Sequence, residues 1–138
     1  MSTQDNKSLV RQFIQRVFER GEMAAVDELL TDDFRPHTYP GTTDRAGLKR
    51  AMERVSQGIA DAQFRIDDVI AEGDRVAVRL TSGATQVGEF MGMPPSGKRY
   101  EIEEIHVFRV RDGRISEHWH QFDQLGMMRQ LGAMPGQN

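Results

Sequence analysis

The chain has 138 residues, 38% of them hydrophobic, and a formal net charge of −3, which predicts one domain over residues 1–138 that does not bind nucleic acid. It contains no cysteine, which excludes disulfides and thiolate chemistry and favours a cytoplasmic protein. No apolar run approaches the roughly 20 residues that cross a bilayer, so small molecules are the expected partners and a membrane is not.

The first half of the chain has the apolar spacing of helices. Residues 5–20 carry leucine, valine, isoleucine and phenylalanine at intervals of three and four on a polar background, which predicts an amphipathic helix. A short helix over 23–30 follows. Residues 31–43 contain two prolines and predict a loop. Thr43 is expected to cap a third helix, with Asp44 in its first turn.

From Gln63 onward the period changes to two, which predicts strands. Residues 64–70 and 75–86 alternate on either side of a short turn, and a connection over 88–99, rich in glycine, proline and methionine, follows as a pocket rim or a plain surface loop. Helices followed by antiparallel strands predict an α+β domain. We expect a curved antiparallel sheet packed on the N-terminal helices, shaped as a cone around one cavity.

Residues 100–123 form two strand-like runs around a turn and predict a β-hairpin. Two pairing registers compete. A two-residue turn at 112–113 would set His106 against Trp119 and mix polar and apolar residues on both faces. A three-residue loop over 111–113 would set His106 against His118, and Glu104 against His120.

The three-residue loop is favoured because it separates the side chains by type. One face then carries only ionisable groups, namely Glu104, His106, His118 and His120. Such a row costs desolvation energy if it is covered and unpaired, so it should border water or a ligand-filled cavity. The other face carries Ile105, Val107, Ile115 and Trp119, an apolar surface that predicts a homodimer or higher homo-oligomer through the sheet.

Several motifs together resemble one known family. They are KSLVRQFIQRVFERGEMAAVDELLTDDF, HTYPG, FRIDDVIAEGDRVAVRL, GEFMGMPPSGKR and HVFRVRDGRISEHWHQFDQLGMMRQLG. In this order they resemble the SnoaL-like polyketide cyclases, also called ester cyclases, within the superfamily of nuclear transport factor 2. The resemblance implies a cone-shaped barrel and a cyclase or isomerase that needs no cofactor and no metal and acts on a hydrophobic, carbonyl-bearing polyketide.

The resemblance also implies roles for individual residues. In the characterised cyclases, an acidic residue directly after the tryptophan of the E-H-W motif acts as general acid and base in an intramolecular aldol closure. That position is His120 here, a departure from the family pattern, although an imidazole also exchanges protons near neutral pH. The histidine that assists at the enolate corresponds to His106. Glu104 is expected to fix the tautomer of His120 or to raise its basicity.

Further side chains are candidates for contact with a substrate. His118, His37 and Tyr39 are expected near the pocket. The candidate apolar walls, each of which core packing would explain equally well, are Phe13, Val17, Phe34, Met52, Phe90, Met91 and Phe122. Two other functions stay open: a protein that only binds a hydrophobic molecule, and a zinc or iron enzyme that uses the histidine and glutamate cluster.

Overall fold

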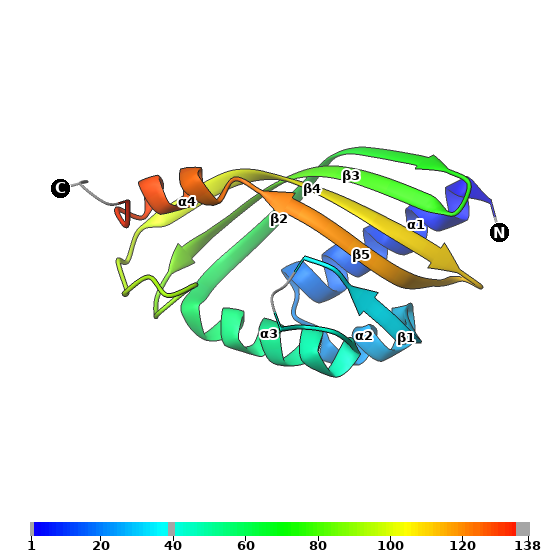
Figure 1. Cartoon of the computed structure of the whole chain (residues 1–138). Helices are drawn as coiled ribbons and strands as arrows, with labels where there is room; N and C mark the ends of the chain where they lie inside the picture. The colour runs from blue at the N-terminus through cyan, green and yellow to red at the C-terminus, as the bar shows by residue number, and fades with distance from the viewer. Residues whose placement is uncertain (1, 39–40, 135–138) are drawn as a thin grey trace.

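The computed structural model describes residues 2–38 and 41–134, and its centre is a curved five-stranded sheet with helices on the concave side (Figure 1). The strand order is β1-β5-β4-β3-β2. The strands are β1 Leu30–Pro36, β2 Ile59–Glu72, β3 Arg75–Gln86, β4 Arg99–Arg111 and β5 Arg114–Phe122. β1 pairs with β5 in parallel, and all other pairs are antiparallel. The predicted α+β architecture is confirmed.

Four α-helices flank this sheet in the described part of the chain: α1 Thr3–Phe13, α2 Met23–Leu29, α3 Arg45–Gly58 and α4 Gln124–Gln130. α1 continues into a π-helical turn, η1 Ile14–Glu19. Asp44, and not Thr43, caps α3, because its carboxylate accepts a 2.8 Å hydrogen bond from the backbone N–H of Gly47. No helix among these residues is long and apolar enough to span a membrane.

The strand β1 lies inside the segment predicted as a loop, so that prediction was wrong. Leu30, Thr31, Phe34 and Pro36 are buried, whereas Asp32, Asp33 and Arg35 are exposed. Pro36 is tolerated because β1 is an edge strand, where one side of the backbone needs no ladder partner. Tyr39 lies outside the described residues.

Two apolar clusters form the core. The larger one lies between α1, η1, α2 and the inner face of the sheet, and it contains Phe13, Val17 and Phe34, none of them more than 1% exposed. The smaller cluster lies under α4 and the β3–β4 connection and contains Phe90, Met93, Tyr100, Ile102, Met127 and Leu131. The inward side chains of β4 and β5 run from one cluster to the other.

The β4–β5 hairpin has neither of the two predicted registers. Its turn has two residues, Asp112 and Gly113, both with positive φ (52° and 79°), and Arg111 pairs with Arg114. A bulge at Ser116 then shifts the pairing by one residue, since Val110 faces Ile115 but Arg109 faces Glu117.

The bulge corrects the predicted partners and preserves the predicted faces of the residues that follow it. Ile115, which precedes the bulge and pairs with Val110, lies in the larger core cluster and not on the outer face as predicted. His106 lies opposite His120, Phe108 opposite His118, and Glu104 opposite Phe122. The predicted loop and the observed bulge displace the register by one residue in opposite directions. Both displacements reverse the side on which every later residue of β5 lies, so the ionisable side chains share one face in either case.

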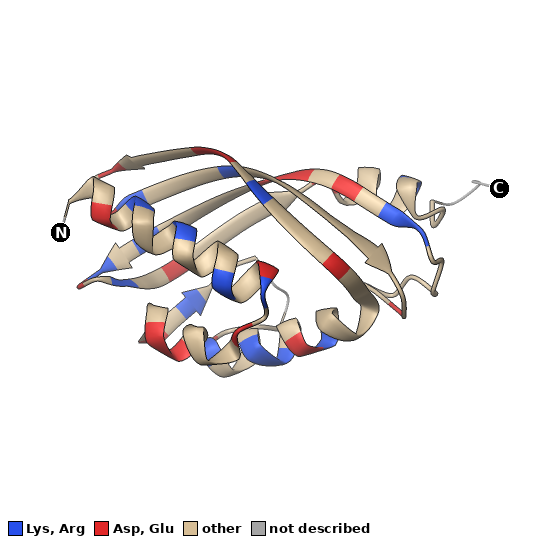
Figure 2. Cartoon of the chain, turned by 180° about the vertical axis from the view of Figure 1, so that it is seen from behind, with Lys and Arg blue, Asp and Glu red and all other residues tan. Residues whose placement is uncertain are grey.

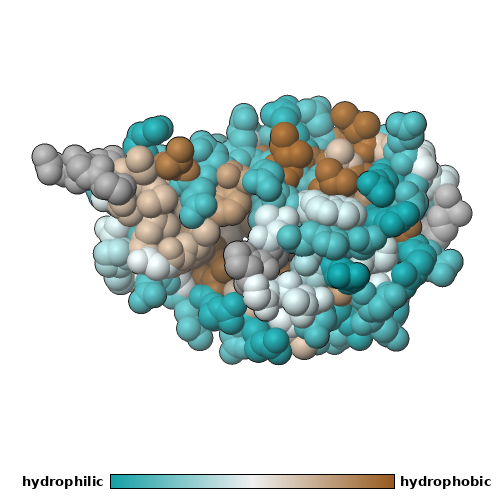
Figure 3. Space-filling view, in the orientation of Figure 1, coloured by the Kyte–Doolittle hydropathy of each residue, from teal (hydrophilic) through white to brown (hydrophobic). Residues whose placement is uncertain are grey.

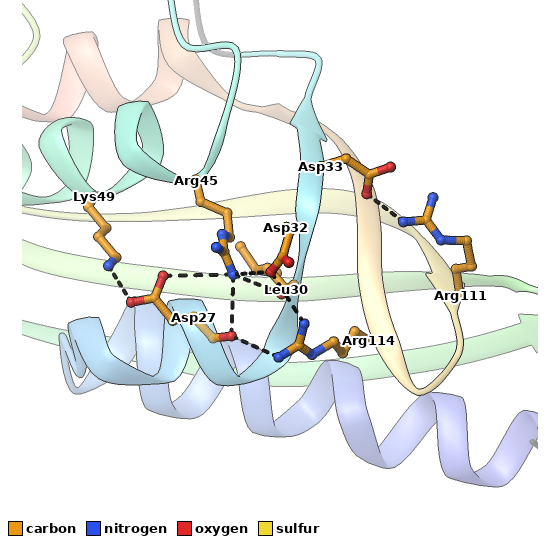
Figure 4. Close-up of polar contacts among 8 residues, drawn as sticks. All are labelled: Asp27, Leu30, Asp32, Asp33, Arg45, Lys49, Arg111 and Arg114. Atoms are coloured by element: carbon orange, nitrogen blue, oxygen red, sulfur yellow. Dashed lines mark hydrogen bonds and ion pairs between the residues drawn. The ribbon is translucent and has the colours of Figure 1, made fainter.

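Charged side chains of both signs alternate over the helices and strands (Figure 2). At the corner where α2 meets β1, they form a network (Figure 4): Arg45 lies 3.3 Å from Asp32 and donates to the backbone oxygens of Asp27 and Leu30, while Lys49 pairs with Asp27. Arg114 also donates to the Asp27 carbonyl. The network fastens the C-terminal end of α2 to α3 and β5.

Candidate active site

Four ionisable side chains lie together on the inner face of the sheet. Glu104 and His106 project from β4, and His118 and His120 project from β5. They share this face because residues two apart on a strand point to the same side, and because the Ser116 bulge places the β5 histidines inward. The three imidazoles are stacked, with ring centroids 5.0–5.3 Å apart.

A chain of hydrogen bonds connects three strands. Ser82 of β3 donates from Oγ to Oε2 of Glu104. The other carboxylate oxygen, Oε1, lies 2.8 Å from Nε2 of His106, and Nδ1 of His106 lies 2.8 Å from Nε2 of His118. An ionised carboxylate only accepts, so His106 carries a proton on Nε2 when it faces that carboxylate.

Solvent exposure increases along this face from His118 toward the end of β5. His118 and His106 are each 1% exposed, His120 is 6% exposed, and the Glu104 side chain is 13% exposed. The backbone N–H of His120 donates to Oγ1 of Thr38, which ties the strand to the segment after β1. His120 and Glu104 are therefore the most exposed members of the cluster.

The surroundings shift the pKa values of these groups in different directions. Burial, followed by the neighbouring His106, lowers the pKa of His120 to about 4, although Glu104 acts in the opposite direction. Burial lowers the pKa of His118 well below 6.5. Burial raises the pKa of Glu104, but its contacts with His106 and Ser82 outweigh burial and leave it below 4.5. At neutral pH the site therefore combines neutral imidazoles at His118 and His120 with an ionised carboxylate at Glu104.

Aromatic residues enclose the deep end of the cluster. Phe108 stacks on His118 with a centroid distance of 4.4 Å, and Phe13 and Phe18 contact the same imidazole edge-on and at a tilt. Phe13, Val17 and Phe34 are core residues beneath the histidines, and they offer no exposed wall. Met52 and Phe122 are only partly buried, and Phe122 stacks on His120 at 5.8 Å.

The open space near the site lies toward α3 and α4. In the space-filling view, a hollow opens near the middle of the face, between the regions of α4 and α3 (Figure 3). A separate open pocket of about 540 Å³ lies between the β3–β4 connection and the end of α4, with Met91, Met93 and Met128 in its wall. Phe90 is buried in the smaller cluster and is not part of that wall.

The β3–β4 connection is held from below. Gln86 is completely buried, and its amide donates 3.0 Å hydrogen bonds to the backbone oxygens of Met93 and Pro94. Its own oxygen accepts from Ser96. The connection therefore forms a fixed wall at this end of the molecule, and of its two methionines Met91 is exposed and Met93 is buried.

His37 does not join the other histidines. Its Nε2 lies 2.7 Å from Glu117, and its ring stacks on Trp119 at 4.7 Å. Glu117 and Trp119 alternate with the inward histidines of β5, so they point to the convex face. The structure thus places His37, which was expected near the pocket, beside Glu117 and Trp119 and apart from the other three histidines.

Sequence reasoning missed Ser82 and Thr38. A signal for Ser82 was present, since the inward positions of β3 read Val76, Val78, Leu80, Ser82 and Ala84, and a hydroxyl in such a row needs a partner. Thr38 carries no comparable signal, because it follows a strand that the sequence did not reveal.

The three histidines also have the composition of a metal site. One nitrogen from each of His106, His118 and His120 lies within 4.8 Å of the others. However, Nδ1 of His106 and Nε2 of His118 point toward each other in a 2.8 Å hydrogen bond. An ion between them would have to break that bond and turn both rings, so the observed geometry fits proton sharing better than metal ligation.

Comparisons of the sequence and the structure with known proteins show which family this chain resembles. The sequence model of the family described as SnoaL-like polyketide cyclase matches residues 8–131. Aklanonic acid methyl ester cyclase DnrD from Streptomyces peucetius is 42% identical over 140 residues, covering 96% of this chain and 92% of that protein. Aklanonic acid methyl ester cyclase DauD from Streptomyces sp. (strain C5) is 42% identical over 127 residues, covering 86% and 79%. TsrD from Streptomyces laurentii superposes with a TM-score of 0.88 at 30% identity, covering 97% and 99%.

Proposed function

This chain belongs to the SnoaL-like polyketide cyclases, and we propose that it closes a ring by intramolecular aldol addition in a methyl ester of a polyketide acid. Two relatives that are 42% identical over most of the chain are named as cyclases of such an ester, which supports this substrate class. The reaction moves one carbon-bound proton to a new alkoxide and forms one carbon–carbon bond, so product and substrate have the same mass.

The observation that carries the proposal is the position of His120, which stacks on His106 and His118 and is the most exposed imidazole of this buried cluster. Its imidazole is neutral at physiological pH, because its pKa is about 4, and a neutral imidazole can accept the proton from the carbon next to a carbonyl. The resulting imidazolium can return the proton to the alkoxide that forms when the ring closes.

Glu104 is the group that stabilises this imidazolium. Its carboxylate is ionised and lies on the same face, and its charge raises the pKa of His120. In a largely dry site such a charge interaction is stronger than in water. The loss of Glu104 should therefore reduce the rate of proton abstraction even though Glu104 does not take the proton itself.

His106 acts behind these two residues. Nε2 of His106 is engaged with Glu104 and Nδ1 with His118, so neither nitrogen is directed toward a substrate oxygen. The resemblance implied that this histidine assists at the enolate directly. We propose instead that His106 orients the Glu104 carboxylate.

A second candidate function is binding without turnover. The observation that favours it is the low pKa of His120, since a group with a pKa of about 4 is a weak base at neutral pH. The two candidates differ in what the histidine does, because a binding protein needs only the shape of the pocket.

The test is to incubate the purified protein with aklanonic acid methyl ester and to follow the product by liquid chromatography and mass spectrometry. We expect a product of unchanged mass, and we expect His120→Asn to lower kcat by roughly 10²- to 10⁴-fold. Gln121→Ala, an exposed neighbour on the opposite face, is the matched control and should turn over at the wild-type rate. Tight binding without turnover, unaffected by His120→Asn, would favour the binding protein.

Three further properties belong to the proposal. Catalysis without a cofactor is tested by metal analysis of tag-free protein and by dialysis against a chelator, which should leave turnover unchanged; a stoichiometric metal ion would contradict it.

A homodimer through the convex face is proposed from its exposed apolar residues. The cytoplasmic location remains a prediction from the sequence.

A further inference from the structure

Ser82 is the one polar side chain of β3 that joins the histidine cluster. It is 2% exposed and pairs across the sheet with Ile102, two residues before Glu104, so the two side chains meet diagonally across neighbouring strands. Its hydroxyl donates to Oε2 of Glu104.

The direction of this hydrogen bond is fixed by chemistry. An ionised carboxylate has no proton to donate, so Ser82 is the donor. This leaves Oε1 for Nε2 of His106, at 2.8 Å. The Ser82 hydroxyl is not hydrogen-bonded to His106, because His106 lies on the other side of the Glu104 carboxylate. The arrangement therefore gives Ser82 no base and makes it a poor nucleophile.

We infer that Ser82 is a positioning residue, which holds the Glu104 carboxylate so that the proton of His106 stays on Nε2 and the charge of Glu104 stays directed at His120. Without the hydroxyl, Oε2 loses its partner in a site where the Glu104 side chain is only 13% exposed. The carboxylate would then turn toward another donor or toward water. Either movement loosens its contact with His106.

The effect of Ser82 on His106 extends to His118 of β5, because these two rings share a proton. When Nε2 of His106 carries a proton and the ring is neutral, Nδ1 accepts from Nε2 of His118; when the ring is charged, Nδ1 donates to it. The Ser82 hydroxyl on β3 thus limits the hydrogen-bonded chain of Glu104, His106 and His118 to these two protonation states. The effect on turnover rests on the proposed function, whereas the effect on the imidazoles does not.

The test compares Ser82→Ala with the wild type by long-range ¹H–¹⁵N correlation NMR of the histidine rings. We expect the wild type to show a protonated Nε2 at His106, and Ser82→Ala to show a mixture of tautomers at His106 and a displaced titration midpoint for His120. With the ester substrate, kcat should fall roughly tenfold to hundredfold with little change in KM, and the midpoint of the pH–rate profile should move.

Two further variants sharpen the comparison. Ser82→Thr keeps the hydroxyl and should restore both the tautomer and the pH–rate profile. Thr81→Ala removes the neighbouring hydroxyl of β3, which donates to the Asp67 carboxylate outside the cluster, and should leave the imidazole signals unchanged. If Ser82→Ala does not fold, Ser82→Cys keeps the volume with only a weak donor and should show the same displaced signals.

The inference is overturned if Ser82→Ala, or Ser82→Cys in its place, keeps the wild-type imidazole signals, or if Thr81→Ala displaces them equally. A wild-type protein that turns over no ester would defeat the proposed function alone, since the NMR comparison needs no substrate.

Discussion

His106 and His120 lie directly opposite each other on β4 and β5, with ring centroids 5.0 Å apart and planes within 10°. At this separation a positive charge on one ring disfavours a positive charge on the other. The pair therefore exchanges at most one proton readily, which suits a site that must take up a proton and release it in a single reaction.

The same arrangement makes stability depend on pH. The unfolded chain binds a proton at His120 below pH 6.5, whereas the folded chain does not until pH about 4, because burial lowers the pKa. Acidification in this window therefore favours unfolding. We expect the free energy of unfolding to fall by up to about 3 kcal/mol between pH 6.5 and pH 4, measured by urea denaturation.

Two variants assign this effect to its source. His120→Asn removes the titrating ring and should flatten the curve in this window, with the remaining slope assigned to His118, whose pKa is also lowered. Gln121→Ala should follow the wild type. Glu104 acts in a lower window, since its pKa lies below 4.5 and its contribution is lost only as the pH falls further. Parallel curves for the wild type and His120→Asn would contradict the assignment.

The hairpin turn gives a second prediction. Asp112 has φ +52°, a left-handed conformation that asparagine and glycine adopt more easily than other residues, whereas β-branched residues adopt it poorly. Asp112→Asn should leave stability unchanged or raise it by a few tenths of a kcal/mol, and Asp112→Val should lower it by about 1–2 kcal/mol.

Thermal unfolding followed by circular dichroism measures both variants. The control for adding a β-branched residue is Gln121→Val, at an exposed position in a regular part of β5. Asp68→Val would not serve, because Asp68 pairs with Arg79. A destabilisation by Asp112→Val no larger than that of Gln121→Val would show that the turn conformation costs little.

The sequence predicted the architecture and the shared face of the histidines, but not their pairing. The alternation of Ile105 and Val107 with Glu104 and His106 is local, so it could be read directly. The bulge at Ser116 could not, because Ser116 is buried like its neighbour Ile115 and no glycine marks the extra residue. The separation into two faces survived because a bulge and a longer turn reverse the same alternation.

Long-range contacts explain what else remained hidden. β1 pairs with a strand some eighty positions later, as in the contact of Pro36 with His118, and the prolines of its segment gave a local signal for a loop. The contact of Ser82 with Glu104 crosses between strands diagonally, and it depends on a register that local alternation does not determine.

The network at the end of α2 supports a third prediction. Arg45 donates to the carbonyl oxygens of Asp27 and Leu30 at the C-terminal end of α2 (Figure 4). Carbonyl groups at this end of a helix have no backbone N–H donor within the helix, so a cationic side chain there is stabilising. Arg45→Ala should lower the free energy of unfolding by about 1 kcal/mol. Arg54 is exposed on α3, the helix that also carries Arg45. Arg54→Ala is therefore the control and should change the free energy of unfolding by less than about 0.5 kcal/mol. Equal effects of the two variants in urea denaturation would show that the network adds no stability.

The convex face of the sheet supports the last prediction. Ile70, Ala77, Val107 and Trp119 occupy one row across four strands, and Ile105 lies beside them. Ile70 is 67% exposed and Ile105 is 55% exposed, which is unfavourable for large apolar side chains in water. A second copy that presents the same face would cover both.

We expect the wild type to sediment as a dimer and Ile105→Glu to sediment as a monomer, because the substitution places a like charge near its own symmetry mate in a face that must lose water. Leu125→Glu, at an exposed leucine in α4 away from this row, is the matched control and should remain a dimer. A wild type that is monomeric at micromolar concentration in analytical ultracentrifugation would contradict the dimer. Circular dichroism of Ile105→Glu separates loss of association from loss of folding, since the exposed position should accept the charge without a change in the spectrum of the folded chain.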